Sequence, residues 1–463
     1  MMMKYPMSLA QVSMGLLALL FLCCSRDPMA QARQGGIPDT LTTDRRAVAA
    51  EMRSVLDTDL VRWYPLSIDT VYGGYFSDID YRWRLAGMQN KMIVTQARHV
   101  WTSSIAAMFY PNGNSYRAVA AHGAAFLRNT MWDHEAGGFY DLVTREGTPI
   151  KEGDVIIKRA YGNAFAIYGL AAYAKATGDK QALQLAQDAF RWLDKASHDP
   201  VNGGYFQFLS REGVPLTDGY RGIPPKDQNS TIHLLESFTA LYEVWPDPVV
   251  RERLSSLLHI IRDTIVSDQG YMRLFFRKDW TPVSYRNSPE AERRSHFELD
   301  HISPGHDVET AYLMLEASQA LELRNDTTTL RVAKKMVDFA IRNGWEKDPG
   351  GIYDGCAVSG EDQHVSAVRD TKEWWEQVEG FNAFLLMADL FPADSAHYYE
   401  KFCTQWDYCK KYVIDREHGG WYHGGVDKEP WSTRSPKSGI WKCNYHTSRA
   451  LINCIRKLSG SSG

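Results

Sequence analysis

Helical periodicity dominates the hydrophobic pattern of this chain. The segment 164–174 is almost entirely apolar or small, and Gly178 follows it, which is typical of a helix that ends at a glycine. A second periodic segment runs from 181 to 196, and the same pairing recurs at 234–244 and 249–266. The pattern therefore predicts pairs of consecutive helices.

A glycine motif followed by aromatic residues recurs between these helix pairs, usually after an acidic residue. The steps from the last glycine of one copy to that of the next are 64, 66, 66, 81 and 69 residues. Such regular spacing indicates an internal repeat of about two helices plus a short glycine–aromatic loop or hairpin. The six copies are 72–76, 137–140, 203–206, 269–271, 350–353 and 419–422.

Six stacked helix pairs can form an open solenoid or close into a ring of inner and outer helices. An open solenoid without polar ends would expose apolar surface, so closure is favoured. The sequence thus predicts an all-α fold, an (α/α)6 barrel with short glycine–aromatic β-hairpin loops. The segments 145–149 and 211–215 share the pattern Arg-Glu-Gly-x-Pro, which indicates equivalent turns in two hairpins.

The fourth step is the longest, which indicates an insertion in that repeat. The polar, highly charged segment 286–300 is the evident candidate and is expected to form a loop. The length of 463 residues alone would suggest about three domains. The repeat replaces this estimate with one catalytic barrel domain over residues 33–463.

Residues 1–32 have the pattern of an export signal and are not expected to belong to the barrel. A lysine precedes the apolar run 14–23, which is too short to cross a bilayer comfortably. Small residues suit cleavage after Ala32, whereas Cys23 or Cys24 would be acylated in a bacterial lipoprotein. A buried N-terminal helix is the alternative. We expect an exported protein, periplasmic or attached to the outer membrane, and an N-terminal lipid is the one membrane anchor that the sequence offers.

The charge balance argues against a nucleic-acid partner. The chain has 52 Lys and Arg against 56 Asp and Glu, so no basic surplus exists to neutralise phosphates. Aromatic residues make up 12% of the chain, and flat aromatic faces suit sugar rings as well as protein cores.

Cysteine usage and the missing motifs indicate no metal or cofactor. Five scattered cysteines follow the export signal, which is typical of buried thiols with at most one disulfide. The sequence has no CxxC pair, no HExxH motif and no glycine-rich phosphate loop. The five cysteines are Cys356, Cys403, Cys409, Cys443 and Cys454.

Polar and aromatic residues recur at one phase of the repeat, close to where each inner helix begins. Because the same phase should reach the same end of the barrel each time, we expect these residues to line a central pocket. The alternative is a set of unrelated capping or core residues. The candidates are Arg98, Tyr161, Asn163, His233, His306, Trp374, Trp375, Glu379, Trp441 and His446.

His306 has the surroundings expected of a general base. Ser303 is expected to cap the helix, with Pro304 in its first turn. His306 and Glu309 are three residues apart and share one helix face, so the carboxylate can hold the imidazole. A histidine held in this way titrates near neutrality and can accept a proton. Asp307 points elsewhere and is expected to be a first-turn residue favoured by the helix dipole.

Two further histidines lie at the same phase. His446 follows a tryptophan-containing segment, and His233 follows Asn229 and Ser230, either of which can cap its helix. One such histidine alone would more often be structural. Three at one phase, with His306, favour catalysis, and the other histidines are expected to be structural.

Six segments carry a resemblance to a known family. The chain resembles the N-acylglucosamine 2-epimerase superfamily, and within it most closely the cellobiose 2-epimerase branch. The resemblance implies an (α/α)6 barrel that acts on a small-molecule sugar without metal or redox cofactor, as a monomer or homodimer. The segments are 97–102, 161–165, 229–236, 305–309, 374–379 and 441–446.

The resemblance also implies catalytic roles. In that family two histidines act as acid and base on opposite faces of a ring-opened sugar, and these roles fall on His306 and His446. By the same resemblance His233 assists ring opening or binding, Arg98 holds substrate oxygens, and Glu309 is the partner of His306.

Aromatic residues would bind the sugar rings in such an enzyme. By the resemblance, Trp441 and one of Trp374 and Trp375 stack on the two sugars of a disaccharide. The cellobiose branch usually has a histidine where Thr231 stands and a glutamine where Asn163 stands. The sequence therefore leaves open whether the substrate is a monosaccharide or a β-linked disaccharide. The full substrate-binding set expected is Tyr161, Asn163, Trp374, Trp375, Glu379 and Trp441.

The residue types fit 2-epimerisation, and three other functions stay open. A neutral imidazole can remove the C2 proton of an open-chain aldose, and a second acid on the other face can return one. An aldose–ketose isomerase would share the enediolate and return the proton to C1. A glycoside hydrolase needs two carboxylates, for which Glu309 and Glu379 are the evident pair. A non-catalytic sugar-binding protein would explain the tryptophans but not the phased histidines.

Overall fold

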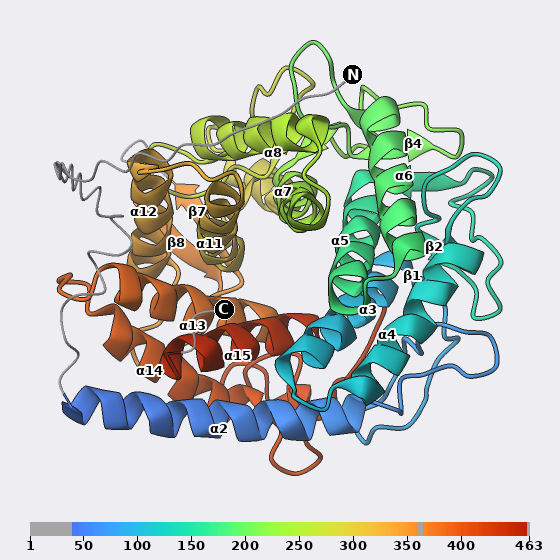
Figure 1. Cartoon of the computed structure of the whole chain (residues 1–463). Helices are drawn as coiled ribbons and strands as arrows, with labels where there is room; N and C mark the ends of the chain where they lie inside the picture. Colours follow the sequence, from blue (N-terminus) through green and yellow to red (C-terminus); the bar gives the residue numbers. More distant parts are fainter. Residues whose placement is uncertain (1–38, 360–363, 461–463) are drawn as a thin grey trace, which may run out of the picture.

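Alternating inner and outer helices form a closed ring (Figure 1). The computed structural model describes residues 39–359 and 364–460, so the expected export signal lies outside the described residues. Six inner helices of the described ranges contact one another in sequence order, and the last contacts the first. They are α3 (Ile93–Phe109), α5 (Ala160–Thr177), α7 (Gln228–Val244), α11 (Pro304–Ala320), α13 (Trp374–Leu390) and α15 (Tyr445–Leu458).

The outer helices complete the predicted (α/α)6 barrel. Five of them follow an inner helix in sequence, whereas α2 comes first in the chain and packs on the last inner helix, α15. This contact joins the two ends of the described chain and confirms the predicted closure. The outer helices are α2 (Asp39–Trp63), α4 (Asn114–Phe126), α6 (Lys180–Ser197), α8 (Pro248–Ile260), α12 (Thr327–Asn343) and α14 (Tyr398–Tyr408).

Side-chain pattern explains which helix of a pair is inner. Helix α5 is apolar or small all round and nearly every residue is buried, as expected for a helix surrounded by neighbours. Helix α6 buries one stripe, which includes Leu185, Ala189 and Leu193, and exposes charged residues on its other face. Asp179 caps α6 by accepting hydrogen bonds from two of its first backbone amides.

The glycine–aromatic motifs form tight loops beside the outer helices. In each copy a residue after the glycines makes an isolated β-bridge to a residue shortly after the preceding outer helix, as Phe139 does with Trp132. Gly137 and Gly138 both have φ of 72°, and a Cβ on either would collide with the Trp192 ring. Glycine is therefore required in this loop. Helices α4, α8 and α14 enter it through single π-helical turns, η2 (Leu127–Met131), η3 (Ile261–Ile265) and η4 (Cys409–Val413).

Antiparallel bridges close the predicted hairpin loops, and four strand pairs are also present in the described residues. Three of these pairs join one repeat to the next, with helices between their two strands in the sequence, whereas the strands of the fourth pair are neighbours in the sequence and form a hairpin. Arg145 and Arg211 occupy equivalent turns, as predicted, and their Nε atoms each donate to an aspartate Oδ2 at 2.9 Å. The pairs are β1 (Lys91–Met92) with β2 (Leu142–Val143), β3 (Ile157–Arg159) with β4 (Phe208–Ser210), β5 (Lys226–Asp227) with β6 (Phe275–Phe276), and β7 (Gly355–Ser359) with β8 (His364–Arg369).

The insertion is not the expected loop. It contains two short helices, α9 (Glu290–Ser295) and α10 (Phe297–Asp300). An ion pair between Glu290 and Arg294 spans one turn of α9. The Phe297 ring stacks on the His301 ring with centroids 4.6 Å apart, and the Arg369 guanidinium of β8 lies over it. These contacts fix the insertion against the hairpin, whereas its charge alone predicted a loop.

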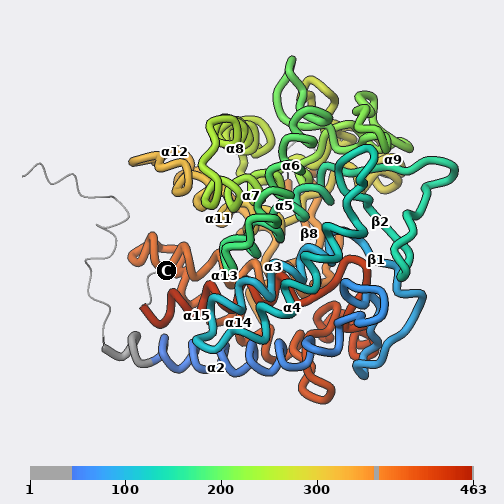
Figure 2. The backbone as a smooth tube through the Cα atoms, turned by 45° about the vertical axis from the view of Figure 1, so that its right-hand side comes forward, coloured from blue at the N-terminus to red at the C-terminus, as the bar shows by residue number. Residues whose placement is uncertain are grey.

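Strands and loops gather at one end of the barrel (Figure 2). Strands β1, β3 and β5 lead directly into the inner helices α3, α5 and α7, so the N-termini of these helices face that end. The five cysteines of the described residues are all free thiols, as expected, and each is buried except the partly exposed Cys403. Among the described residues, no helix is both long enough and apolar enough to cross a membrane.

Buried lysines fasten the loops to the inner helices. Lys226 has a side chain with no exposure, and its ammonium group donates to Asp199 Oδ2 and to the Gly203 carbonyl, each at 2.8 Å. Lys91 and Lys158 make the same pair of contacts with Asp69 and Asp133 of their own loops. In these three copies the acidic residue that precedes the motif is thus one half of a buried ion pair.

Removing one of these lysines should destabilise the barrel. Lys226→Met leaves the Asp199 carboxylate without its cation, so we expect a loss of about 3–5 kcal/mol of unfolding free energy. The matched control Lys175→Met breaks an exposed pair with Glu243, and such pairs contribute about 0–1 kcal/mol. Urea denaturation of both variants measures the difference. Equal midpoints for the two variants would contradict this account.

Candidate active site

Side chains from the first two turns of five inner helices meet at the loop-bearing end of the ring. Helices α7, α11 and α15 supply His233, His306 and His446, and α3 and α13 supply Arg98 and Glu379. All five side chains are wholly or largely buried. The repeat phase therefore brings together residues that lie far apart in the sequence.

One arginine connects three buried carboxylates. Arg449 of α15 donates to Glu236, Glu309 and Glu379, which come from three different inner helices. The distance from Arg449 Nη2 to Glu379 Oε1 is 2.8 Å. Tyr445 adds a hydroxyl that donates to Glu236. Arg449 thus ties α7, α11 and α13 to α15 and compensates charges that burial would otherwise disfavour.

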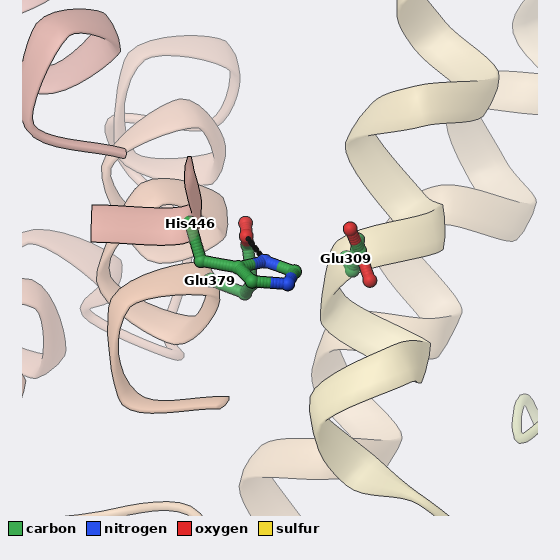
Figure 3. A group of neighbouring side chains, drawn as sticks. All are labelled: Glu309, Glu379 and His446. Atoms are coloured by element: carbon green, nitrogen blue, oxygen red, sulfur yellow. Dashed lines mark hydrogen bonds and ion pairs between the residues drawn. The ribbon is translucent and has the colours of Figure 1, made fainter. Parts of the chain in front are cut away.

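His446 is held by Glu379 (Figure 3). Its Nδ1 lies 2.6 Å from Glu379 Oε1, and Figure 3 shows its ring directed towards Glu309 on the facing helix. Tyr312 donates to the other oxygen of Glu379 at 2.7 Å. Because a carboxylate accepts hydrogen bonds, this contact selects the Nδ1–H tautomer and leaves Nε2 as the basic nitrogen.

His306 has a different partner from the one expected. Its Nδ1 lies 2.8 Å from Ser303 Oγ, so Ser303 holds the imidazole and does not cap the helix with its side chain. Glu309 shares the helix face, but one of its oxygens binds Arg449 and the other has no hydrogen-bond partner. The predicted Glu309–His306 pair was wrong because the full charge of Arg449 competes for the carboxylate.

His233 forms the second histidine–glutamate pair. Its Nδ1 lies 2.9 Å from Glu236 Oε2, and both residues are buried. The Tyr161 ring lies edge-on to His233 at 5.3 Å between centroids. Arg98 donates to the Tyr161 hydroxyl and to the Trp441 carbonyl, each at 3.2 Å. Arg98 and Tyr161 therefore lie beside His233, as the repeat phase predicted.

The three candidate tryptophans differ in whether they lie beside the site residues. Trp375 contacts both catalytic candidates, because its ring centroid lies 4.5 Å from that of His306 and 5.7 Å from that of His446. Trp441 is 52% exposed, and its ring lies 6.3 Å from that of Tyr161. Trp374 is buried and lines a separate small cavity with other tryptophans. Trp375, and not Trp374, is thus the member of this pair that faces the histidines.

Asn163 is not placed to bind substrate. Its amide accepts from the backbone of Phe139 and donates to the Arg159 carbonyl, each at 2.9 Å, so it anchors the glycine–aromatic loop. Asp307 also anchors a loop, because its carboxylate accepts a hydrogen bond of 2.8 Å from the backbone amide of Met272. Its role is therefore this anchoring, and not that of a surface helix-dipole residue. The fourth residue of an inner helix repeatedly serves this purpose, which explains why a polar residue stands there.

Asn229 is a further candidate for the site, although its place in the sequence predicted only a helix cap. Asp227 caps α7 by accepting from the Ser230 amide at 3.0 Å, so neither predicted residue is the cap. The Asn229 side-chain oxygen is buried without a hydrogen-bond partner. Asn229 lies at the second position of its helix, as Tyr161, Trp375 and His446 do. That shared position is the signal that would have identified it.

Comparison with known proteins places this geometry in a family. The model of the N-acylglucosamine 2-epimerase (GlcNAc 2-epimerase) family matches residues 74–450. The chain belongs to this family. It is an enzyme that epimerises or isomerises sugars.

Relatives of this family member include both epimerases and isomerases. The chain is 28% identical over 421 residues to a cellobiose 2-epimerase of Bacteroides fragilis, which covers 88% of this chain and 98% of the relative. It is 24% identical to a D-mannose isomerase of Marinomonas mediterranea, over 87% of this chain and 96% of that one. The solved cellobiose 2-epimerase from Spirochaeta thermophila is 29% identical, has a TM-score of 0.77, and covers 91% of this chain and 99% of its own.

Burial keeps the two imidazoles of this epimerase-family site neutral. Desolvation lowers the pKa of His306 to about 3 and holds the pKa of His446 well below its usual value. Burial raises the pKa of Glu379, and Arg449 opposes that rise. Neutral imidazoles are the forms that can remove a proton from carbon.

The acidic residues also raise the question of a metal ion. Glu309, Glu379 and His446 offer ligand atoms within 4.8 Å of one another. Arg449 already places a positive charge against both carboxylates. Among the described residues, Arg449 therefore supplies the positive charge that a metal ion would bring to these carboxylates.

The low pKa of His306 can be measured directly. An ordinary histidine is half-protonated near pH 6.5, whereas burial disfavours the imidazolium of His306, so its ring should stay neutral from pH 8 down to pH 5. NMR of the ¹³C-labelled ring, assigned with His306→Gln, should show no titration in this range. A midpoint near pH 6.5 would contradict the buried geometry.

Proposed function

We propose that the protein is a carbohydrate 2-epimerase that interconverts the C2 configuration of a reducing-end aldose. The observation that carries this proposal is the pair of imidazoles, His306 and His446, which both contact the ring of Trp375. They come from different helices, α11 and α15, so they can approach one substrate carbon from two directions. Epimerisation needs such an arrangement because the proton leaves one face and returns to the other.

The proposed step starts from the open-chain aldose. The Nε2 atom of one histidine takes the C2 proton, and the electron pair of the C–H bond moves into the C1–C2 bond to give an enediolate. The other histidine then gives a proton to C2 from the opposite face, which inverts that centre. The return reaction exchanges the two roles. General acid–base catalysis by each histidine contributes about 10²–10⁴-fold to the rate.

Arg98 would stabilise the negative oxygen that develops at C1 or C2. Its side chain is buried, and its Nε atom has no hydrogen-bond partner among the residues that the structure describes. A donor of this kind placed against a developing oxyanion is worth about 3–4 kcal/mol. His233, fixed by Glu236, lies next to Tyr161 and would transfer protons during ring opening.

The aromatic residues favour a disaccharide over a monosaccharide. Trp375 lies at the histidines, where the reducing-end sugar reacts, and the half-exposed Trp441 lies outward of Tyr161. Two separate aromatic faces suit two sugar rings. A cellobiose- or mannobiose-type substrate therefore fits better than an N-acylglucosamine-type monosaccharide.

The carboxylates argue against glycoside hydrolysis. A hydrolase needs one carboxylic acid and one carboxylate separated by the scissile bond. Glu309 and Glu379 instead bind the same guanidinium of Arg449. Neither is free to protonate a leaving group, so an epimerase or isomerase fits this site better.

NMR in D₂O tests the proposed reaction. The protein is incubated with cellobiose, mannobiose, mannose and N-acetylglucosamine in separate samples. We expect the C2 epimer of a disaccharide to appear with deuterium at C2, because the returning proton comes from solvent. A ketose product would support the isomerase instead, and release of monosaccharides would contradict both.

A further inference from the structure

Glu373 is a partly buried acidic residue next to the site, and the proposed reaction does not use it. It is the residue before α13, and its Oε2 accepts a hydrogen bond of 2.9 Å from the Trp375 indole nitrogen. The indole N–H is the only hydrogen-bond donor of that side chain. Glu373 is thus the one protein group that satisfies Trp375 within the described residues.

The backbone of Glu373 is itself fixed. Glu373 makes a β-bridge with Gly424, and the next amide, of Trp374, donates to the His423 carbonyl at 2.9 Å. A carboxylate on a fixed backbone is a rigid acceptor. It therefore determines the direction in which the Trp375 indole points.

The orientation of Trp375 affects both histidines. Its ring plane makes an angle of 49° with the His306 ring and 45° with the His446 ring. A rotation of the indole would change both contacts at once, and it would also tilt the surface on which a sugar can lie. Catalysis depends steeply on such placement, since a misplacement of about 1 Å can reduce the rate about 10²-fold.

We infer that Glu373 is a positioning residue that holds the Trp375 indole in contact with the two histidines. This inference rests on the proposed function only for its effect on the rate. Other charged groups surround Glu373: Asp354 and Glu429 disfavour its charge, as burial does, and Lys442 favours it. These groups act on Glu373 through their charge, whereas Trp375 donates a hydrogen bond to it.

Two substitutions separate positioning from packing. Glu373→Gln keeps an oxygen acceptor at the same place, whereas Glu373→Leu keeps the volume and removes the acceptor. Glu429→Gln is the matched control, because it removes a nearby charge without touching Trp375. We expect Glu373→Leu to lower kcat at least tenfold with a smaller change in KM. We expect Glu373→Gln and Glu429→Gln to stay within threefold of the wild type.

A readout independent of activity completes the test. Fluorine NMR of 5-fluorotryptophan-labelled protein, assigned with Trp375→Phe, reports on the indole itself. The Trp375 resonance should shift in Glu373→Leu and stay in place in Glu373→Gln, even if the enzyme proves to be an isomerase. An unchanged resonance in Glu373→Leu would overturn the inference. Equal losses of kcat in the Gln and Leu variants would overturn it as well.

Discussion

The ion pairs of Arg449 are the interaction on which the arrangement of the site residues depends. Its guanidinium binds carboxylates from α7, α11 and α13 while its own helix, α15, closes the ring. Two of those carboxylates, Glu236 and Glu379, hold His233 and His446. Breaking a buried charge pair typically destabilises a protein by about 3–5 kcal/mol. One ionic cluster thus closes the barrel at its centre and orients two of its histidines.

Buried ion pairs also hold the glycine–aromatic loops around the site, where each pair joins one lysine to one aspartate. At least three of the glycine–aromatic loops place an aspartate where a buried lysine binds it, as Asp199 and Lys226 show. The polar residue at the fourth position of an inner helix binds the loop from the other side. These ion pairs and hydrogen bonds fix the positions of the inner-helix N-termini relative to the loops. They therefore bring the first two turns of the inner helices, which carry the functional residues, to one end of the ring.

The repeat was enough to predict the fold. Regular glycine spacing predicted the helix pairs, and the phase of the repeat predicted that His306, His446, His233 and Arg98 would lie at one end of the barrel, where the structure places them. Hydrogen-bond partners were harder, because they depend on competition between residues far apart in sequence. Glu309 is near His306 in sequence but is bound by Arg449 in space. Asn163 has the phase of a pocket residue but anchors a loop.

The central claim is that His306 and His446 act on opposite faces of C2, and single-histidine variants test it most directly. Each of His306→Asn and His446→Asn is incubated in D₂O with the two C2 epimers of the substrate separately, with His418→Asn as the control. The account predicts that neither site variant inverts C2, and that each exchanges the C2 proton of a different epimer, because each retains the base for one face. Exchange of the same epimer by both variants, or full epimerisation by either one, would contradict it.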